Sequence, residues 1–171
     1  AATDARVLCG NSLGGAVAMT ALLERDVDLD AAVLAGTGAK LAVLDDLLRW
    51  LRDDFERAIE FLHGPDRLFH DPDERLLEAS RETLHAAGRA VTERDFRTSH
   101  AFDVRGRLGD IDVPTLAVVG EYDALTPPWY HETLAERIPD AEWTTVEDAA
   151  HLAMLERPTG FNEALTDFLD A

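Results

Sequence analysis

Cysteine, lysine and long apolar runs are scarce in this chain of 171 residues, and each scarcity excludes a class of protein. The single cysteine, Cys9, rules out a framework of disulfides within the chain, and we expect it to be buried in a strand. The longest apolar runs, such as residues 33–36 and 115–120, fall far short of the roughly 20 residues that a membrane-spanning helix needs. Hydrophobic residues still make up 46% of the chain, which suffices for the core of one domain and excludes a wholly disordered protein.

Positive charge is the next scarcity. The chain has 16 basic side chains against 34 carboxylates, for a net charge of −18, and Lys40 is its only lysine. This charge repels phosphate backbones and anionic lipid surfaces, so we expect neither nucleic acid nor a membrane as a partner. An acidic surface with almost no lysine resembles halophilic proteins, in which salt screens the self-repulsion. A GC-rich genome also favours arginine, alanine and aspartate, and composition does not separate the two origins.

The first four residues lack a methionine, and a strand-like run follows them almost at once. No charged segment, apolar segment and cleavage site of the kind that directs secretion precedes that run. The start looks cut from a longer chain, so this absence says little about what preceded it. We expect a cytoplasmic protein.

Strands and helices alternate at both ends of the chain. Apolar runs predict four strands, at residues 6–9, 31–35, 115–120 and 142–146. Helices are predicted after three of them, at residues 16–23, 129–137 and 158–169. The alternation indicates an α/β fold, with a parallel sheet of about four strands flanked by helices.

The stretch between the second and third predicted strands is helical. Leucine, phenylalanine and isoleucine recur every three or four residues over residues 41–62, which predicts an amphipathic helix. A second helix is expected from Pro72 to a C-cap at Gly88, and a shorter third one after Thr92. About sixty residues of helix are too many for a single crossover between two strands. We therefore expect an inserted helical lid.

The residues Gly10, Ser12 and Gly14 form the pattern G-x-S-x-G between a predicted strand and a predicted helix. This pattern is typical of a nucleophile elbow, a tight turn that presents a serine hydroxyl at the carboxyl edge of the sheet. We expect that side chains in place of the two glycines would collide with the strand and the helix. The backbone N–H of Leu13 would then face a developing oxyanion from the start of the helix.

A serine hydroxyl needs a base to remove its proton and an acid to orient that base. Asp123 follows the predicted strand that ends at Gly120, and His151 follows the one that ends near Val146. Both therefore lie at the same carboxyl edge as Ser12, where open α/β sheets bind their ligands. The order serine, acid, histidine is the order expected in this architecture.

Three segments together resemble the α/β-hydrolase superfamily, in its C-terminal part from the nucleophile elbow onward. They are the turn at residues 10–15, the strand and loop at residues 114–127, and the histidine loop at residues 149–158. The resemblance implies a partial α/β-hydrolase fold of the serine esterase type, with Ser12 as nucleophile, Asp123 as orienting acid and His151 as base. By the same resemblance, residues 1–38 hold the elbow, residues 39–108 are the lid insertion and residues 109–171 are the C-terminal part of the core.

Several residues keep alternative interpretations. Asp103 and Asp148 are alternative acids for the histidine, although the loop around Asp123 matches the family. Trp50 and Trp129 are candidate residues of the substrate pocket. The other five histidines, His131 among them, show no metal-ligand spacing, so we expect them on the lid or the surface and expect no metal site. A triad of this kind needs no cofactor.

One feature of the family has no counterpart in the sequence. The family has further strands before the elbow, and a loop after an early strand supplies a second oxyanion N–H. Without those strands, the strand from Arg6 to Cys9 is an open sheet edge with which another chain can pair. We expect either a second copy of the chain or a missing N-terminal segment to cover this edge.

The candidate residues predict a serine hydrolase that cleaves small, uncharged carboxylic esters through an acyl-enzyme. A first alternative is hydrolysis of a carbon–carbon bond in a ring-fission product, because relatives of that kind often carry asparagine at the position of Asn11. Asn11 can equally be a neutral polar residue that lines the pocket. A second alternative is a truncated, non-catalytic domain that acts through self-association at the strand from Arg6 to Cys9.

Overall fold

Four parallel strands form the sheet in the computed structural model, which describes residues 5–171. The strands are β1 (Val7–Asn11), β2 (Ala31–Ala35), β3 (Thr115–Gly120) and β4 (Ala141–Val146). They lie in the sheet in the order β1-β2-β3-β4, so the predicted α/β fold with four parallel strands is confirmed. The first four residues, on which the expectation of a cut start rests, lie outside the described residues.

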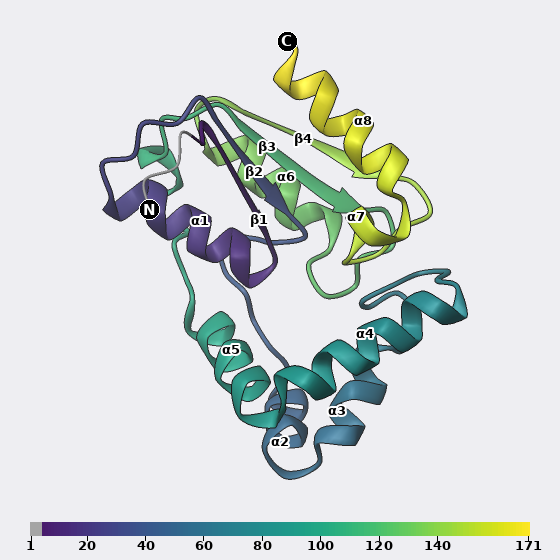
Figure 1. Cartoon of the computed structure of the whole chain (residues 1–171). Helices are drawn as coiled ribbons and strands as arrows, with labels where there is room; N and C mark the ends of the chain where they lie inside the picture. The colour runs from purple at the N-terminus through teal and green to yellow at the C-terminus, as the bar shows by residue number, and fades with distance from the viewer. Residues whose placement is uncertain (1–4) are drawn as a thin grey trace.

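Helices cover both faces of the sheet, as a parallel sheet requires. The helices α1 and α6 lie on one face, and α7 and α8 lie on the other (Figure 1). Leu34 of β2 packs with the residues under α1 and α6, while its neighbours Val33 and Ala35 pack with those under α7 and α8. The bounds are α1 (Leu13–Glu24), α6 (Pro128–Arg137), α7 (Ala153–Glu156) and α8 (Pro158–Leu169).

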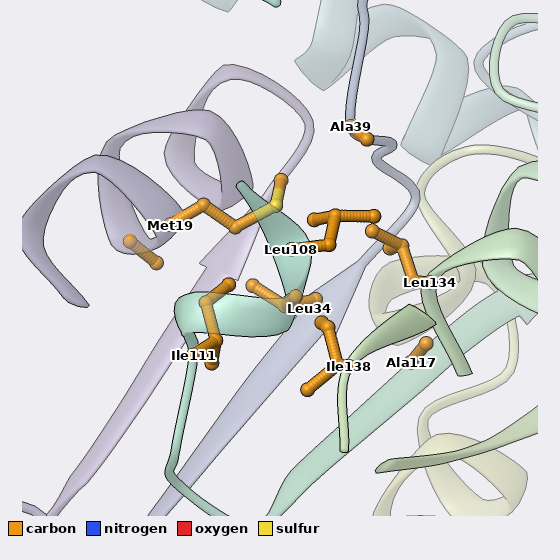
Figure 2. Packing of buried hydrophobic residues seen from close by; sticks show 9 residues of the cluster. Met19, Leu34, Ala39, Leu108, Ile111, Ala117, Leu134 and Ile138 are labelled. Carbon is orange, nitrogen blue, oxygen red and sulfur yellow. The ribbon is translucent and has the colours of Figure 1, made fainter. Parts of the chain in front are cut away.

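Figure 2 shows the core cluster between the sheet and the helices α1 and α6. Met19 from α1, Leu34 from β2 and Leu134 from α6 meet there, and all three are fully buried. Leu108, in the helical turn Leu108–Asp110, packs against the same cluster. Each such side chain stabilises the fold by about 1.5–3 kcal/mol relative to an exposed one. The cluster therefore holds the strands whose carboxyl ends carry the candidate site.

β1 lies at an edge of the sheet, and within residues 5–171 it pairs with β2 alone. Leu8 packs against the core under α1, whereas Val7 and Cys9 alternate to the opposite face and are exposed. The prediction that Cys9 is buried is wrong, because the cluster under α8 takes its strand residues from β2, β3 and β4. Pairing of this edge with a second copy or with a preceding segment stays a prediction.

Four helices fill the stretch between β2 and β3. They are α2 (Asp45–Asp53), α3 (Phe55–Leu62), α4 (Glu74–Ala87) and α5 (Arg89–Ala101). The single helix predicted over residues 41–62 is in fact two, because Asp54 leaves the helical conformation and caps α3 by accepting the Arg57 N–H at 3.3 Å. Gly88, with a φ of 78°, ends α4 as predicted, and α5 begins directly after it rather than beyond Thr92.

These four helices lie apart from the sheet in Figure 1, and α2 and α3 contribute an apolar cluster of their own. The two segments that connect the helices to the sheet run side by side. The Val104 N–H donates to the carbonyl of Ala39 at 2.8 Å, and Lys40 pairs with Asp103 at 3.2 Å. The bounds of the lid, residues 39–108, and its function as a lid stay predictions. Within residues 5–171, every helix is too short or too polar to cross a membrane.

Candidate active site

Ser12 lies in the turn between β1 and α1 with a φ of 53° and a ψ of −118°. A positive φ is unfavourable for a residue other than glycine, so neighbouring contacts must hold it. The Ser12 N–H donates to the carbonyl of Ala35 at 2.9 Å, and the Ser12 carbonyl accepts from the Thr37 hydroxyl at 2.8 Å. The end of β2 therefore holds the serine in the strained turn that is typical of a nucleophile elbow.

The glycines around Ser12 differ in what a side chain would meet. A Cβ at Gly10 would lie 2.2 Å from the carbonyl oxygen of Gly14, and one at Gly15 would lie 2.6 Å from Cγ2 of Thr37. A Cβ at Gly14 would meet nothing within 4 Å. The steric prediction is therefore confirmed for Gly10 and wrong for Gly14, because the close approach of α1 to the segment after β2 falls on Gly15.

The side chains of Asp123 and His151 meet beyond the carboxyl ends of β3 and β4, where Oδ2 of Asp123 lies 2.9 Å from Nδ1 of His151. They are 2% and 5% exposed. Oδ1 of Asp123 accepts the N–H groups of Leu125 and Thr126, and Oδ2 accepts the Thr126 hydroxyl, each at 2.8 Å. The triad pattern does not point to Thr126, although aspartate loops often bond the backbone two or three residues onward.

The surroundings keep Asp123 ionised. Burial by itself raises the pKa of this carboxyl, but the charge of His151 and the hydrogen bonds from His151 and Thr126 outweigh burial and hold the pKa below its ordinary value. An ionised carboxylate can only accept, so it favours the tautomer of His151 with its proton on Nδ1, and in that tautomer Nε2 is free to accept a proton. The pair can therefore present a base, provided that a proton donor lies at Nε2.

Ser12 and His151 line the same cavity. Within residues 5–171 no hydrogen bond joins the Ser12 hydroxyl to the imidazole, and such bonds often form only when a substrate is bound. Leu13 is the first residue of α1, where the N–H groups of the first turn have no partner within the helix. The fold thus brings the predicted nucleophile, base, acid and oxyanion donor to one edge of the sheet.

The two other carboxylates considered from the sequence form no hydrogen bond with His151 within residues 5–171. Asp103 pairs with Lys40 and Arg105, at 3.2 and 2.7 Å, in the segments that connect the helical group. Asp148 is exposed in a turn with a φ of 53°. The described residues hold no cluster of three or more histidine, cysteine, aspartate or glutamate side chains that could bind a metal ion.

His131 on α6 is fully buried and supports the elbow through Thr37. Its Nε2 accepts the Thr37 N–H at 3.0 Å, and the hydroxyl of the same threonine holds the Ser12 carbonyl. Burial lowers the pKa of His131 to about 4, so its ring is neutral at neutral pH. The sequence alone indicated a surface or lid residue. The available signal was its position three residues before the buried Leu134 on the same helix.

The loop between α3 and α4, residues 63–73, reaches the site from the helical group (Figure 1). Three consecutive carbonyls of this loop accept hydrogen bonds from the loops that carry Asp123 and His151. The pairs are Asp66 with the Ala124 N–H at 2.8 Å, Arg67 with the His151 N–H at 3.1 Å, and Leu68 with the Leu152 N–H at 3.0 Å. The helical group is therefore bonded directly to the backbone around the candidate acid and base.

Glu156 at the end of α7 strengthens this junction. Its side chain is buried, and Oε1 accepts the N–H groups of His70 and Asp71 at 2.8 and 2.6 Å. Oε2 accepts the N–H of Ala150, the residue before His151, at 2.9 Å. One carboxylate thus joins the loop of residues 63–73 to the histidine loop. The sequence pattern of the histidine loop contains Glu156 without indicating this function.

A cavity of about 780 Å³ lies beside Ser12 and His151, between the sheet edge and the four helices. Most of its wall is apolar, and Leu44 and Leu155 on this wall are 62% and 54% exposed, so the cavity opens to solvent. Asn11 also lines it, and its Nδ2 donates to the carbonyl of Ala35 at 3.2 Å. Such a space suits a small, largely apolar ligand.

Neither Trp50 nor Trp129 lies on the cavity wall, which corrects the prediction for these two residues. Trp50 packs on Phe61, with ring centroids 5.4 Å apart, and Phe61 lines the cavity in its place. Trp129 is 60% exposed and packs on Tyr130, which lines the cavity. Adjacent residues of a helix point about 100° apart, and in α6 the side that faces the cavity carries Tyr130 rather than Trp129.

Known proteins agree with this geometry. Residues 1–164 match the Alpha/beta hydrolase family, and the chain belongs to that family. A solved thermophilic esterase is 37% identical to it and superimposes with a TM-score of 0.85, over 96% of this chain and 65% of the esterase. The helical group and the sheet edge described above are therefore part of a fold that this chain shares with that esterase.

Two curated relatives also match. The pimeloyl-acyl-carrier-protein methyl ester esterase of Neisseria meningitidis serogroup B is 30% identical over 190 residues, which cover 95% of this chain and 68% of that protein. A RutD protein of Azorhizobium caulinodans, a carbamate hydrolase by name, is 40% identical over 91 residues, covering 53% of this chain and 34% of that protein. This chain thus spans about two thirds of the length of the proteins that it matches over nearly its whole extent.

Proposed function

We propose that this chain carries a serine hydrolase site for small carboxylic esters, with Ser12 as nucleophile, His151 as base and Asp123 as orienting acid. The observation that supports it most is the buried hydrogen bond between Asp123 and His151 beside the cavity that Ser12 lines. The esterases among the similar proteins favour the same class of reaction. Because this chain spans about two thirds of their length, its activity in isolation is part of the proposal.

In the proposed reaction, Oγ of Ser12 attacks the ester carbonyl carbon while Nε2 of His151 takes the hydroxyl proton. The negative charge that develops on the carbonyl oxygen is stabilised by the Leu13 N–H at the start of α1. When the bond to the alcohol oxygen breaks, His151 gives the proton to the leaving alcohol. Water then attacks the acyl-enzyme with the same histidine as base, which releases the acid and restores Ser12.

Two other functions use the same residues differently. Cleavage of a carbon–carbon bond in a ring-fission product keeps the triad, and Asn11 on the cavity wall is the residue that favours it. Against it, the Asn11 amide is bonded to the Ala35 carbonyl, a contact that needs only a polar residue. A non-catalytic module that pairs through β1 is favoured by the open edge of that strand. The cytoplasmic location and the halophilic origin stay predictions.

A fluorophosphonate probe tests the proposal, because it labels only a serine that a neighbouring base activates. We expect labelling of the chain, and none of its Ser12→Ala or His151→Gln variants, in dilute or in multimolar salt. A folded sample that stays unlabelled in every salt concentration contradicts the proposal. Light scattering on the same samples distinguishes the assembly module, which would be an oligomer, from a monomeric hydrolase.

A further inference from the structure

Arg67 is the one residue with a permanent charge among the described residues that line the cavity. Its carbonyl accepts the His151 N–H at 3.1 Å, so its backbone is held beside the candidate base. The chain has 34 carboxylates against 16 cations, yet within residues 5–171 no carboxylate forms an ion pair with Arg67. Arg67 is half-buried beside a mostly apolar wall, where a bound carboxylate can offset the hydration that the guanidinium gives up to a ligand.

Neighbouring groups position the guanidinium and leave donors unused. Nη1 of Arg67 donates to the carbonyl of Phe61 at 2.5 Å, and Cζ lies 3.7 Å from the centre of the Phe61 ring. Gly64 gives it room, since a Cβ there would lie 2.1 Å from Nη1. A guanidinium has five N–H donors in one plane, and no other acceptor among the described residues contacts this one. Two adjacent donors can therefore take both oxygens of one carboxylate.

The hydroxyl groups of the helical wall are already bonded within the protein. Thr83 and Ser99 donate to backbone carbonyls one turn earlier in their helices, at 2.8 and 3.0 Å. The Ser80 hydroxyl lies 3.0 Å from Nε2 of His63. These hydroxyl groups therefore have their own partners. Arg67, in the loop of residues 63–73, is the cation on the cavity wall whose N–H groups are still available to a ligand.

We propose that the cavity selects esters that carry one carboxylate, which Arg67 binds while the ester carbonyl lies at Ser12. This inference rests on the proposed hydrolase function, and it departs from the uncharged ester expected from the acidic composition, because Arg67 lines the cavity. A half-ester of an aliphatic dicarboxylic acid has the required chemistry, because it joins an anionic end to an ester through an apolar chain. An ester that carries its carboxylate on the alcohol side meets the same requirement. The net charge of −18 opposes any anion at long range, and about 0.5 M salt screens that repulsion more than the short contact with Arg67.

Binding without turnover gives the first test. Three amides stand in for the esters. Pentanoic anilide is neutral, glutaric acid monoanilide has a carboxylate on the acyl side, and 4-(pentanoylamino)benzoate has its carboxylate on the aniline, which takes the place of the alcohol. Calorimetry on the Ser12→Ala chain is expected to show at least one carboxylate bound about 10- to 100-fold tighter than the neutral amide. The carboxylate amide that binds more tightly identifies whether the preferred ester carries its carboxylate on the acyl side or on the alcohol side. Equal affinity for all three amides overturns the inference.

Variants of Arg67 give the second test. In the Ser12→Ala background, Arg67→Met is expected to remove the preference for a carboxylate, and Arg67→Lys to keep part of it. The matched control is Arg57→Met. Arg57 belongs to α3, its Cζ lies 4.3 Å from the centre of the Trp50 ring, and it does not line the cavity. Arg57→Met removes the same charge and the same kind of stacking contact as Arg67→Met. We expect this control to keep the preference for a carboxylate over the neutral amide. Equal loss in both methionine variants, or no loss in Arg67→Met, contradicts the inference.

The variants must be folded for this comparison, which thermal unfolding establishes, and Arg67→Lys keeps the test valid if Arg67→Met unfolds. Failure of this inference is distinguishable from failure of the hydrolase proposal. Labelling of Ser12 without any carboxylate preference leaves the hydrolase and removes the subsite. Carboxylate binding that depends on Arg67, in a chain whose Ser12 is never labelled, leaves the subsite and removes the hydrolase.

Discussion

The backbone N–H of His151 donates a hydrogen bond to the carbonyl oxygen of Arg67 at 3.1 Å. One residue further along, Leu152 and Leu68 pair in the same way, so the histidine loop and residues 63–73 are joined along their backbones. The helical group therefore helps to position the candidate base, in addition to forming the cavity wall. Changes that loosen this junction are expected to reduce reactivity at Ser12 without touching Ser12 itself.

Glu156→Gln tests the junction. The amide keeps one acceptor but turns an NH2 group toward backbone N–H groups, which leaves a buried donor unpaired. We expect a loss of about 1–3 kcal/mol in the free energy of unfolding, measured in urea, and slower fluorophosphonate labelling of Ser12. Glu163→Gln makes the same chemical change on the exposed face of α8 and should alter neither quantity. Equal behaviour of the two variants would show that the Glu156 contacts add nothing.

His131 is expected to make stability depend on pH. Its folded pKa of about 4 lies below the 6.5 of an unperturbed histidine, so between these values the unfolded chain binds a proton that the folded chain does not. Stability should therefore fall as the pH falls from about 6.5 to about 4. For this one group, the loss between pH 7 and pH 5 is on the order of 2 kcal/mol.

His131→Gln provides the comparison, because a glutamine oxygen can still accept the Thr37 N–H. We expect urea unfolding of this variant at pH 7 and pH 5 to differ by about 2 kcal/mol less than that of the parent chain. The difference between the two chains is the measured quantity, since the other titrating groups act equally in both. Identical pH dependence of the two chains would mean that His131 is protonated in the folded state as readily as in the unfolded state.

Gly10→Ala and Gly14→Ala form a matched pair in the elbow. A Cβ at Gly10 meets the backbone oxygen of Gly14 at 2.2 Å, so that variant should lose several kcal/mol or fail to fold. A Cβ at Gly14 meets nothing, and alanine is favoured over glycine in a helix by up to about 1 kcal/mol. Thermal unfolding is therefore expected to rank Gly14→Ala at or above the parent chain. A large loss of stability in Gly14→Ala would contradict the described turn.

Asp123→Asn separates the candidate acids. An asparagine can donate to Nδ1 of His151 and so favour the tautomer with its proton on Nε2, which cannot act as a base; changes of this kind lower turnover by about 10⁴ in serine triads. We expect ester hydrolysis and probe labelling of the folded variant to fall by a comparable factor. Asp148→Asn replaces an exposed carboxylate in the same region and should leave both rates within about twofold. Loss of activity in Asp148→Asn alone would show that Asp148, and not Asp123, is the acid that orients His151.

Local sequence signals were sufficient where a single element determines the outcome. Continuous apolar runs located β2 and β3, since both strands are buried on both faces. Gly88 marked the end of α4, because a backbone with a φ of 78° suits glycine. The continuous stripe over residues 41–62 was misleading, because the apolar period runs through Asp54 although the helix does not.

Contacts between distant segments could not be read in the same way. The exposure of Cys9 depends on which strands α8 covers, and the position of Gly15 against Thr37 depends on the angle at which α1 leaves the elbow. The choice of Tyr130 over Trp129 for the cavity depends on the rotation of α6 about its own axis. Each of these depends on how one element is oriented against another, which a single local run of residues does not determine.

The sequence by itself determined the order of strands and helices, the serine turn, and the placement of Asp123 and His151 beyond two strand ends, because each follows from local conformational preference and from the shared direction of parallel strands. Only the tertiary structure decided which groups support that edge. Glu156, His131 and the carbonyl of Arg67 act through hydrogen bonds to segments between 6 and 94 residues away along the chain. Such bonds depend on the packed geometry of the whole chain, and a local pattern of residue types carries no record of it.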